Sequence, residues 1–186
     1  MPLYFAYGAN MDTAAMRDRC PRSTPIGRAR LVRHRFALIA EGYATVATDP
    51  RAIVHGVLWD LALSDVRGLD AFESVGSGLY RKIVQPVFRD GGASSRALVY
   101  VGRAAASARP LPGYMESVIA SARDWALPEA YIRELEGFRA GAVRISAVAP
   151  GGFRDPKPKP PVRALRDEAG NVKVRPRFGS PMDRSK

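Results

Sequence analysis

Apolar residues occur along most of the chain in short runs that turn residues separate. The first run, residues 2–6, predicts a strand that breaks at Gly8. We interpret Asp49-Pro50 and Asp90-Gly91-Gly92 as turns or loops between strands. Further strand-like segments are expected at 29–40, 43–47, 53–61, 80–88 and 96–101.

Two helices are predicted among these strands from their capping residues. Asp12 is a suitable N-cap for a short helix after the first strand. Ser64 is a suitable N-cap for a helix over about 65–72, because its hydroxyl can accept from a free backbone N–H of the first turn. This second helix ends just before Glu73.

Two more helices are predicted after the last strand. Pro112 opens a helix that reaches about residue 125, and Pro128 lies early in another that reaches about residue 138. The strands and helices together predict a mixed α/β (α+β) fold, in which the strand spacing alone supports no more than a mixed sheet with helices.

The pattern changes near Gly151. The chain there reads Pro156-Lys157-Pro158-Lys159-Pro160-Pro161 and continues as a basic stretch with few large apolar residues. Such a segment cannot bury enough apolar surface to form a stable core. We therefore expect one folded domain over residues 1–140 and an extended or disordered, Pro-rich basic tail over residues 141–186.

More than half of the net charge of +11 lies in this tail. Residues 151–186 hold ten Lys and Arg side chains and four Asp and Glu side chains, which accounts for +6 of the total. A basic block can bind nucleic acid through salt-dependent contacts, but blocks of charge often serve only solubility. We favour a solvated tail and keep a basic nucleic-acid-binding module as an alternative function.

The sequence also carries expectations about compartment and metal binding. The N-terminus lacks the pattern of a signal peptide, and no apolar run approaches the roughly 20 residues that cross a bilayer. Cys20 is the only cysteine, which is typical of a reducing compartment. His34, His55 and Cys20 are scattered without a recognised metal-ligand spacing. We expect a cytoplasmic protein without a metal site or membrane contact.

A sharp turn, Tyr7-Gly8-Ala9-Asn10, follows the first predicted strand directly. Gly8 permits a close approach of backbone to ligand. Such a turn can present successive backbone N–H groups to an anion or a developing oxyanion. Short glycine turns are common in loops, so this feature alone indicates only the end of a strand.

Glu73 lies where the second predicted helix runs into a glycine-containing loop and then a strand. A carboxylate at such a junction can act as a base if partial burial raises its pKa. The competing interpretation is a solvated glutamate at a helix end, because most carboxylates are exposed.

A third segment joins Pro112-x-Tyr114 to Leu127-Pro128-x-x-Tyr131. Alone it is a proline-bounded pair of helices, in which Tyr114 is more typical of core than of catalysis.

Together, in this order, the three segments resemble the γ-glutamylcyclotransferase family over roughly residues 3–138. The hallmark of that family is a Tyr-Gly-Ser-Asn turn after the first strand, and this chain has Ala9 in place of the Ser. The family's catalytic Glu lies in a segment like Leu-Asp-x-x-Glu-x-Val-x-x-Gly-x-Tyr. That most specific segment matches here at Leu69, Asp70, Glu73, Val75, Gly78 and Tyr80.

The resemblance implies a small barrel-like sheet with flanking helices, and an enzyme that needs no cofactor. The implied reaction cyclises a γ-glutamyl group to 5-oxoproline and releases an amine or amino acid. In it Glu73 is the general base, and the pocket lies between Glu73 and the turn. The implied substrate-binding residues are the turn residues Tyr7, Gly8, Ala9 and Asn10, with Tyr80 and Tyr114 as pocket hydroxyls.

Several points stay open at this level. Glutathione, γ-glutamyl dipeptides and γ-glutamylamines share the reacting group, so the leaving amine cannot be inferred, and neither can the oligomeric state. The Ala9 substitution removes a hydroxyl while the backbone donors of the turn survive. A binding or regulatory member of the same fold that has lost catalysis is a further alternative, since a fold alone does not establish activity.

Overall fold

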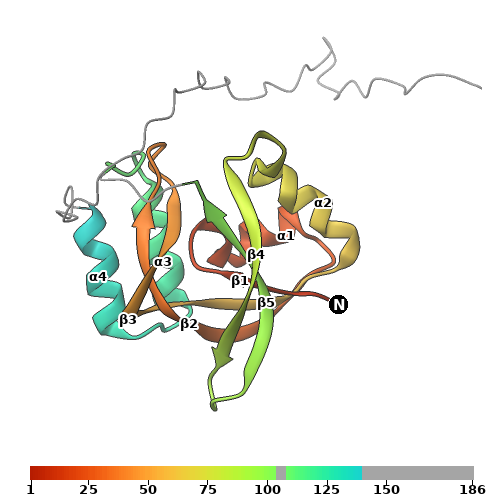
Figure 1. The fold of residues 1–186 in the computed structure, drawn as a ribbon, viewed down its shortest axis with the longest axis horizontal. Coiled ribbons are helices and arrows are strands. Elements are labelled where there is room, and N and C mark those ends of the chain that lie inside the picture. Colours follow the sequence, from red (N-terminus) through yellow and green to blue (C-terminus); the bar gives the residue numbers. More distant parts are fainter. Residues whose placement is uncertain (104–107, 140–186) are drawn as a thin grey trace, which may run out of the picture. The chain divides into compact units, whose positions relative to one another are not determined.

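The computed structural model describes residues 1–103 and 108–139. Figure 1 shows these residues as a small curved sheet, with α1 and α2 together on one side and α3 and α4 together on the other. The strands are β1 (Leu3–Ala6), β2 (Thr24–Leu38), β3 (Ala44–Asp60), β4 (Tyr80–Arg89) and β5 (Ser94–Gly102). The α-helices are α1 (Thr13–Arg19), α2 (Leu63–Phe72), α3 (Tyr114–Asp124) and α4 (Glu129–Arg139), and two 3-10 turns are η1 (Ala9–Met11) and η2 (Val75–Ser77).

The strands close into a barrel in the order β1-β3-β2-β4-β5. β1 is antiparallel to β3 and parallel to β5. The parallel pair places Leu3 beside Ala97 and Tyr4 beside Leu98, and it closes the ring. The predicted small barrel-like sheet with flanking helices is therefore confirmed.

β3 is one continuous strand, which corrects the prediction of two strands separated by a turn at Asp49-Pro50. The pairing of β3 with β2 shifts between Val32 and His34, and Arg33 between them has a φ of 61°. Because proline lacks an N–H, it is tolerated where a bulge interrupts the hydrogen-bond ladder. The turn residues thus mark a bulge inside a long strand.

The hairpin between β4 and β5 turns at the predicted position. Gly91 and Gly92 have φ values of 91° and 90°, which residues with a Cβ rarely adopt. The Gly92 N–H donates to the carbonyl of Arg89 at 3.0 Å. The sequence Asp90-Gly91-Gly92 therefore forms the predicted turn, because its two glycines can adopt the positive φ values that the turn requires.

Asp12 caps α1 as predicted, since its carboxylate accepts from the N–H groups of Ala14 and Ala15 at 2.8 and 3.1 Å. The predicted Ser64 cap of α2 is wrong, because the helix begins earlier, with Ala62 at its N-cap. The Ala62 N–H donates to the Ser23 hydroxyl at 3.1 Å, so a residue from the segment before β2 satisfies the start of α2.

The last two helices follow the prediction closely. α3 begins at Tyr114 after Pro112 and Gly113, and α4 begins directly after Pro128. The core fills the barrel and the space beneath the helices, and its largest buried side chains include Phe5, Met11, Phe36, Leu58, Trp59 and Tyr100. The tail predicted over residues 141–186 lies outside the described residues.

Candidate functional site

The turn after β1 is built as a short 3-10 helix, η1, that begins at Ala9. The N–H of Met11 donates to the carbonyl of Gly8 at 3.0 Å. A Cβ on Gly8 would lie 3.1 Å from both the Ala44 Cβ and the Tyr114 hydroxyl oxygen, so glycine allows these two residues to approach the turn closely. Within the described residues, the backbone N–H groups of Gly8 and Asn10 donate to no backbone carbonyl or side chain.

Glu73 is the C-cap residue of α2, and its N–H donates to the carbonyl of Leu69 at 2.9 Å. Ser74 follows in the left-handed conformation with a φ of 53°, a conformation that is costly for a residue with a Cβ. The Ser74 carbonyl accepts from the N–H groups of Ser77 and Leu79 and from the Ser77 hydroxyl. This tight loop reverses the chain immediately after Glu73 and leads into β4.

The turn and the helix end meet at a hydrogen bond between side chains. Asn10 Nδ2 donates to Glu73 Oε1 at 2.7 Å and to the Tyr4 hydroxyl at 2.9 Å. On the other side of the amide, Arg19 Nη1 donates to Asn10 Oδ1 at 2.6 Å. Residues from β1, η1, α1 and α2 therefore form one connected polar cluster.

Glu73 is only partly exposed, and its environment changes its acidity. Burial raises the pKa of Glu73 to about 7, while the charge of Arg19 and the hydrogen bond from Asn10 act in the opposite direction. A carboxylate with a pKa near neutrality is suited to both accept and return a proton at neutral pH. Strongly shifted carboxylates are also concentrated at functional sites.

Two tyrosines of the predicted site bind the same stretch of backbone. The Tyr80 hydroxyl donates to the carbonyl of Ala44 at 2.6 Å, and the Tyr114 hydroxyl accepts from the Ala44 N–H at 3.1 Å. Within the described residues neither hydroxyl is hydrogen-bonded to Glu73. Both hydroxyls thus lie near the turn through Ala44, and Tyr114 still has its own proton to donate.

The Tyr7 side chain has a structural role, because its buried hydroxyl donates to the carbonyl of Tyr100 on β5. The proton of the Tyr7 hydroxyl is therefore engaged inside the protein, and a contribution of Tyr7 to ligand binding stays a prediction. Ala9 is partly exposed in the turn. The cavity predicted between the turn and Glu73 stays a prediction.

Sequence reasoning missed Tyr4, Arg19 and Ala44. Tyr4 and Arg19 contact Asn10, and Ala44 anchors the two tyrosines. Ala44 contributes only backbone atoms, which no sequence motif reveals. Arg19 occupies the last turn of a helix, where a basic residue is already favoured by the helix dipole.

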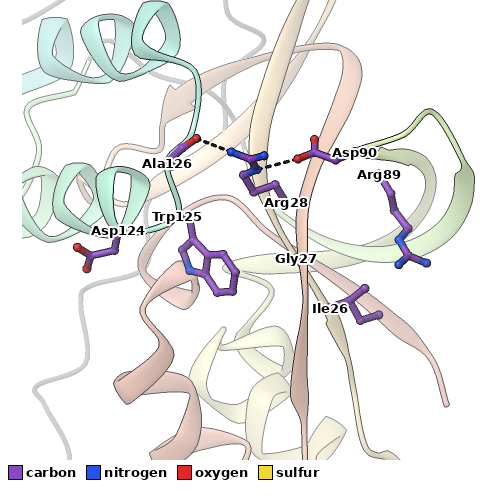
Figure 2. A pocket seen from close by; sticks show the side chains of 8 residues that line it. All are labelled: Ile26, Gly27, Arg28, Arg89, Asp90, Asp124, Trp125 and Ala126. Atoms are coloured by element: carbon purple, nitrogen blue, oxygen red, sulfur yellow. Dashed lines mark hydrogen bonds and ion pairs between the residues drawn. The ribbon is translucent and has the colours of Figure 1, made fainter.

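A pocket of about 450 Å³ lies between the start of β2, the β4–β5 hairpin and the junction of α3 and α4, and its lining includes Trp125, which donates to the carbonyl of Met11 in η1. Figure 2 shows Arg28 between Asp90, which it contacts at 2.7 Å, and the carbonyl of Ala126. Neither Glu73 nor the turn residues line this pocket. We place the candidate site at Glu73 because the shifted carboxylate and the donors of the turn meet there, whereas Arg28 and Asp90 neutralise each other.

Two further features of the described residues bear on partners. No group of three or more His, Cys, Asp or Glu side chains in residues 1–103 and 108–139 is arranged to hold a metal ion. No helix within the same residues is long and apolar enough to span a membrane. Cytoplasmic location stays a prediction.

The chain is thus a small α+β protein with a closed five-stranded barrel, in which a partly buried glutamate lies beside a glycine turn. Comparisons with known proteins identify the class of proteins that it resembles. The model of the AIG2-like family matches residues 53–135. The γ-glutamylcyclotransferases of Mus musculus and Homo sapiens are 31% and 30% identical to this chain over 144 residues, which are 72% of this chain and 77% of each relative. A solved structure of a γ-glutamyl cyclotransferase superposes with a TM-score of 0.68 at 27% identity, and covers 83% of this chain and 92% of its own.

The chain belongs to the γ-glutamylcyclotransferase-like (AIG2-like) family. The family resemblance inferred from the three sequence segments is confirmed.

Proposed function

We propose that this protein is a γ-glutamylcyclotransferase, which converts a small γ-glutamyl compound to 5-oxoproline and releases an amine or amino acid. The observation that carries the proposal is the Glu73 carboxylate, whose pKa burial raises to about 7 and which Asn10 of the glycine turn holds at 2.7 Å. Family membership supports the same chemistry.

The acidity of Glu73 suits the nucleophile of this reaction. The α-amine of a γ-glutamyl group titrates near about 8, so at neutral pH it is mostly a non-nucleophilic ammonium. Transfer of its proton to an ordinary glutamate, with a pKa of about 4, costs about 5 kcal/mol. Transfer to a carboxylate with a pKa of about 7 costs only about 1 kcal/mol. Burial of Glu73 therefore lowers the cost of making the nucleophile.

The reaction then proceeds in three steps. Glu73 takes one proton from the α-ammonium, and the neutral amine attacks the γ-carbonyl carbon to form the new C–N bond. The attacking nitrogen gives its second proton to solvent. The bond from the γ-carbon to the leaving nitrogen breaks as Glu73 returns its proton to that nitrogen, and Glu73 ends as it began.

The turn supplies candidate donors for the negative charge that develops on the γ-carbonyl oxygen. The N–H groups of Gly8 and Asn10 are available for this because they have no partner within the described residues. One such donor typically lowers the barrier by about 2.7 to 4 kcal/mol. Because these donors are backbone groups, Ala9 in place of a serine leaves them intact.

We assign Tyr80 and Tyr114 to substrate orientation. Their hydroxyls are fixed by the backbone of Ala44, so they present hydrogen-bonding groups in set positions beside the turn. A pre-positioned substrate gains much of its rate from proximity, because nucleophile and electrophile belong to the same molecule.

The test is release of 5-oxoproline from a panel of γ-glutamyl amino acids and γ-glutamylamines, with Glu73→Gln and Asp70→Asn compared with the wild type. Glu73→Gln keeps the shape and an acceptor for Asn10 but removes the base. General bases contribute about 100-fold to 10,000-fold, so we expect a loss of at least about 100-fold. Asp70→Asn makes the same chemical change one turn earlier on α2 and should retain most of the activity.

The outcomes are distinct. Turnover by the wild type and by Asp70→Asn, with loss in a folded Glu73→Gln protein, supports the proposal and names the leaving amine. Equal turnover by the wild type and Glu73→Gln contradicts the role of Glu73. Absence of turnover across the whole panel favours the non-catalytic alternative.

A further inference from the structure

We propose that Arg19 is a positioning residue that fixes the orientation of the Asn10 side-chain amide and thereby holds Glu73 as an ionisable base. This inference rests on the proposed function. No motif of the sequence singles out Arg19. Its role follows from the structure, in which Arg19, the last residue of α1, donates to Asn10 in the turn that precedes α1.

The first argument is the polarity of the hydrogen bonds. A guanidinium group only donates, so the atom of Asn10 that faces Arg19 at 2.6 Å has to be the carbonyl oxygen. The amide NH₂ then faces the other way and donates to Glu73 and to Tyr4. Arg19 therefore determines that Glu73 receives a donor.

The second argument concerns which form of Glu73 this orientation stabilises. An N–H donor favours the ionised carboxylate, whereas a carbonyl oxygen in the same place would favour the protonated acid. Without Arg19, the Asn10 amide can rotate by half a turn and present its oxygen to a protonated Glu73. Arg19 thus selects the ionised state through Asn10, and its positive charge lowers the pKa of Glu73 in the same direction.

The third argument is the anchoring of Arg19 itself. Its guanidinium carbon lies 3.9 Å from the centre of the Phe72 ring, the residue directly before Glu73. This distance is within the range of a cation–π contact. Arg19 consequently links the end of α1, the turn and the end of α2, and the stack keeps its donor directed at Asn10.

The other titratable groups near Glu73 do not compete with Arg19 for this role. One is Asp70 on α2, whose carboxylate is already paired with Lys82 Nζ at 2.7 Å. The others are tyrosines from β1 and the residue after it, β4, β5 and α3, and burial raises the pKa of every one of them, so that all stay neutral up to pH values well above 8. These residues are Tyr4, Tyr7, Tyr80, Tyr100 and Tyr114.

The experiment compares the full-length wild type with Arg19→Met, Arg19→Lys and Arg17→Met. Arg17→Met removes the same charge from an exposed position of the same helix and serves as the matched control. The acid limb of kcat/KM against pH is measured for 5-oxoproline release. In parallel, the Glu73 carboxyl is titrated by ¹³C NMR and is assigned as the resonance that Glu73→Gln removes.

We expect both midpoints to move to higher pH by about one unit in Arg19→Met, because the variant lacks both the nearby positive charge and the donor that turns the Asn10 N–H toward the carboxylate. A charge or hydrogen bond of this kind typically shifts the pKa of a carboxyl by about one to three units. At pH 6 this gives roughly a tenfold lower kcat/KM, and near pH 9 the loss is much smaller. Arg19→Lys should shift both midpoints less, because it keeps the charge but not the planar donor. Arg17→Met should leave both unchanged.

Unchanged midpoints in folded Arg19→Met would overturn the inference, and so would equal shifts in Arg19→Met and Arg17→Met. If Arg19→Met does not fold, Arg19→Lys carries the test, and an unshifted Glu73 titration in that variant has the same meaning. The NMR titration needs no turnover. A shift without activity on any substrate would therefore reject the proposed function and retain the role of Arg19.

Discussion

Asp70 and Glu73 lie one turn apart on the same helix, yet the structure treats the two carboxylates in opposite ways. Asp70 contacts Lys82 Nζ at 2.7 Å and accepts from the Tyr100 hydroxyl at 2.6 Å. Glu73 is more deeply enclosed and receives one hydrogen bond, from the neutral amide of Asn10. Partial burial alone would raise the pKa of Asp70, but its two hydrogen bonds and the Lys82 charge together lower it. The pKa of Glu73 is raised.

The two shifts have opposite consequences for stability. A carboxyl whose pKa is lowered on folding stabilises the folded state above its unfolded pKa, and this contribution is lost as the pH falls. A carboxyl whose pKa is raised on folding destabilises the folded state once it ionises. The fold therefore gains from Asp70 at neutral pH and loses from Glu73. A residue whose ionisation destabilises the folded state at neutral pH is a candidate for a functional role.

The largest expected effect is on the pH dependence of unfolding. An unfolded glutamate titrates at about 4.3 and folded Glu73 at about 7, so ionisation of Glu73 removes up to about 4 kcal/mol of unfolding free energy across that window. Glu73→Gln lacks this loss. Urea unfolding of both proteins from pH 4 to 8 should show the variant gaining stability over the wild type as the pH rises.

The difference between the two unfolding curves cancels the other titrating groups. A difference that stays flat between pH 4 and 8 would mean that Glu73 has an ordinary pKa, and the contrast with Asp70 would then fail. If the stability advantage of Glu73→Gln over the wild type instead decreased as the pH rises, the pKa of Glu73 would be lowered in the folded state, as that of Asp70 is.

A smaller effect is expected when Asp70 loses its neutral partner. Tyr100→Phe keeps the ring that packs against Tyr4 at 5.6 Å and removes only the hydrogen bond to Asp70. We expect a loss of about 1 kcal/mol in unfolding free energy at pH 7. The loss should shrink as the pH is lowered below the ordinary aspartate pKa of about 3.9, because Asp70 is then progressively protonated and gains less from the bond. A loss that does not change with pH would show that Asp70 is not the group concerned.

The smallest effect belongs to the ion pair of Asp70. Lys82 and Asp70 are 33% and 28% exposed, so water screens much of their attraction. Lys82→Met should cost about 0.2 to 1 kcal/mol at low salt. Repeating the measurement in 1 M NaCl should bring the variant close to the wild type. A loss that survives the salt would point to packing of the lysine stem.

Sequence reasoning found the two separate halves of the candidate site but not the contacts between them. Asn10 and Glu73 stand in recognisable local segments, and the turn after β1 and the end of α2 are local structures. Arg19 has no such context, because its contact with Asn10 depends on how α1 packs against the turn.

Local signals also failed where a distant residue decided the outcome. Ser64 has the chemistry of an N-cap, but Ser23 reaches the start of α2 and satisfies it, so the helix begins earlier. Pro50 has the chemistry of a turn, yet the pairing of β2 with β3 continues past it through a bulge. The barrel itself followed from the family resemblance, since strand periodicity does not specify closure.

One contact at the edge of the site has an optical consequence. Trp125 Nε1 donates to the carbonyl of Met11 at 2.8 Å, so an indole ring is hydrogen-bonded to the turn that contains Asn10. The chain's other tryptophan, Trp59, is almost fully buried among the strands. Indole emission responds to hydrogen bonding and local polarity, and the protein thus contains its own fluorophore at the turn. In a Trp59→Phe background, occupancy of the turn would be readable without any added label.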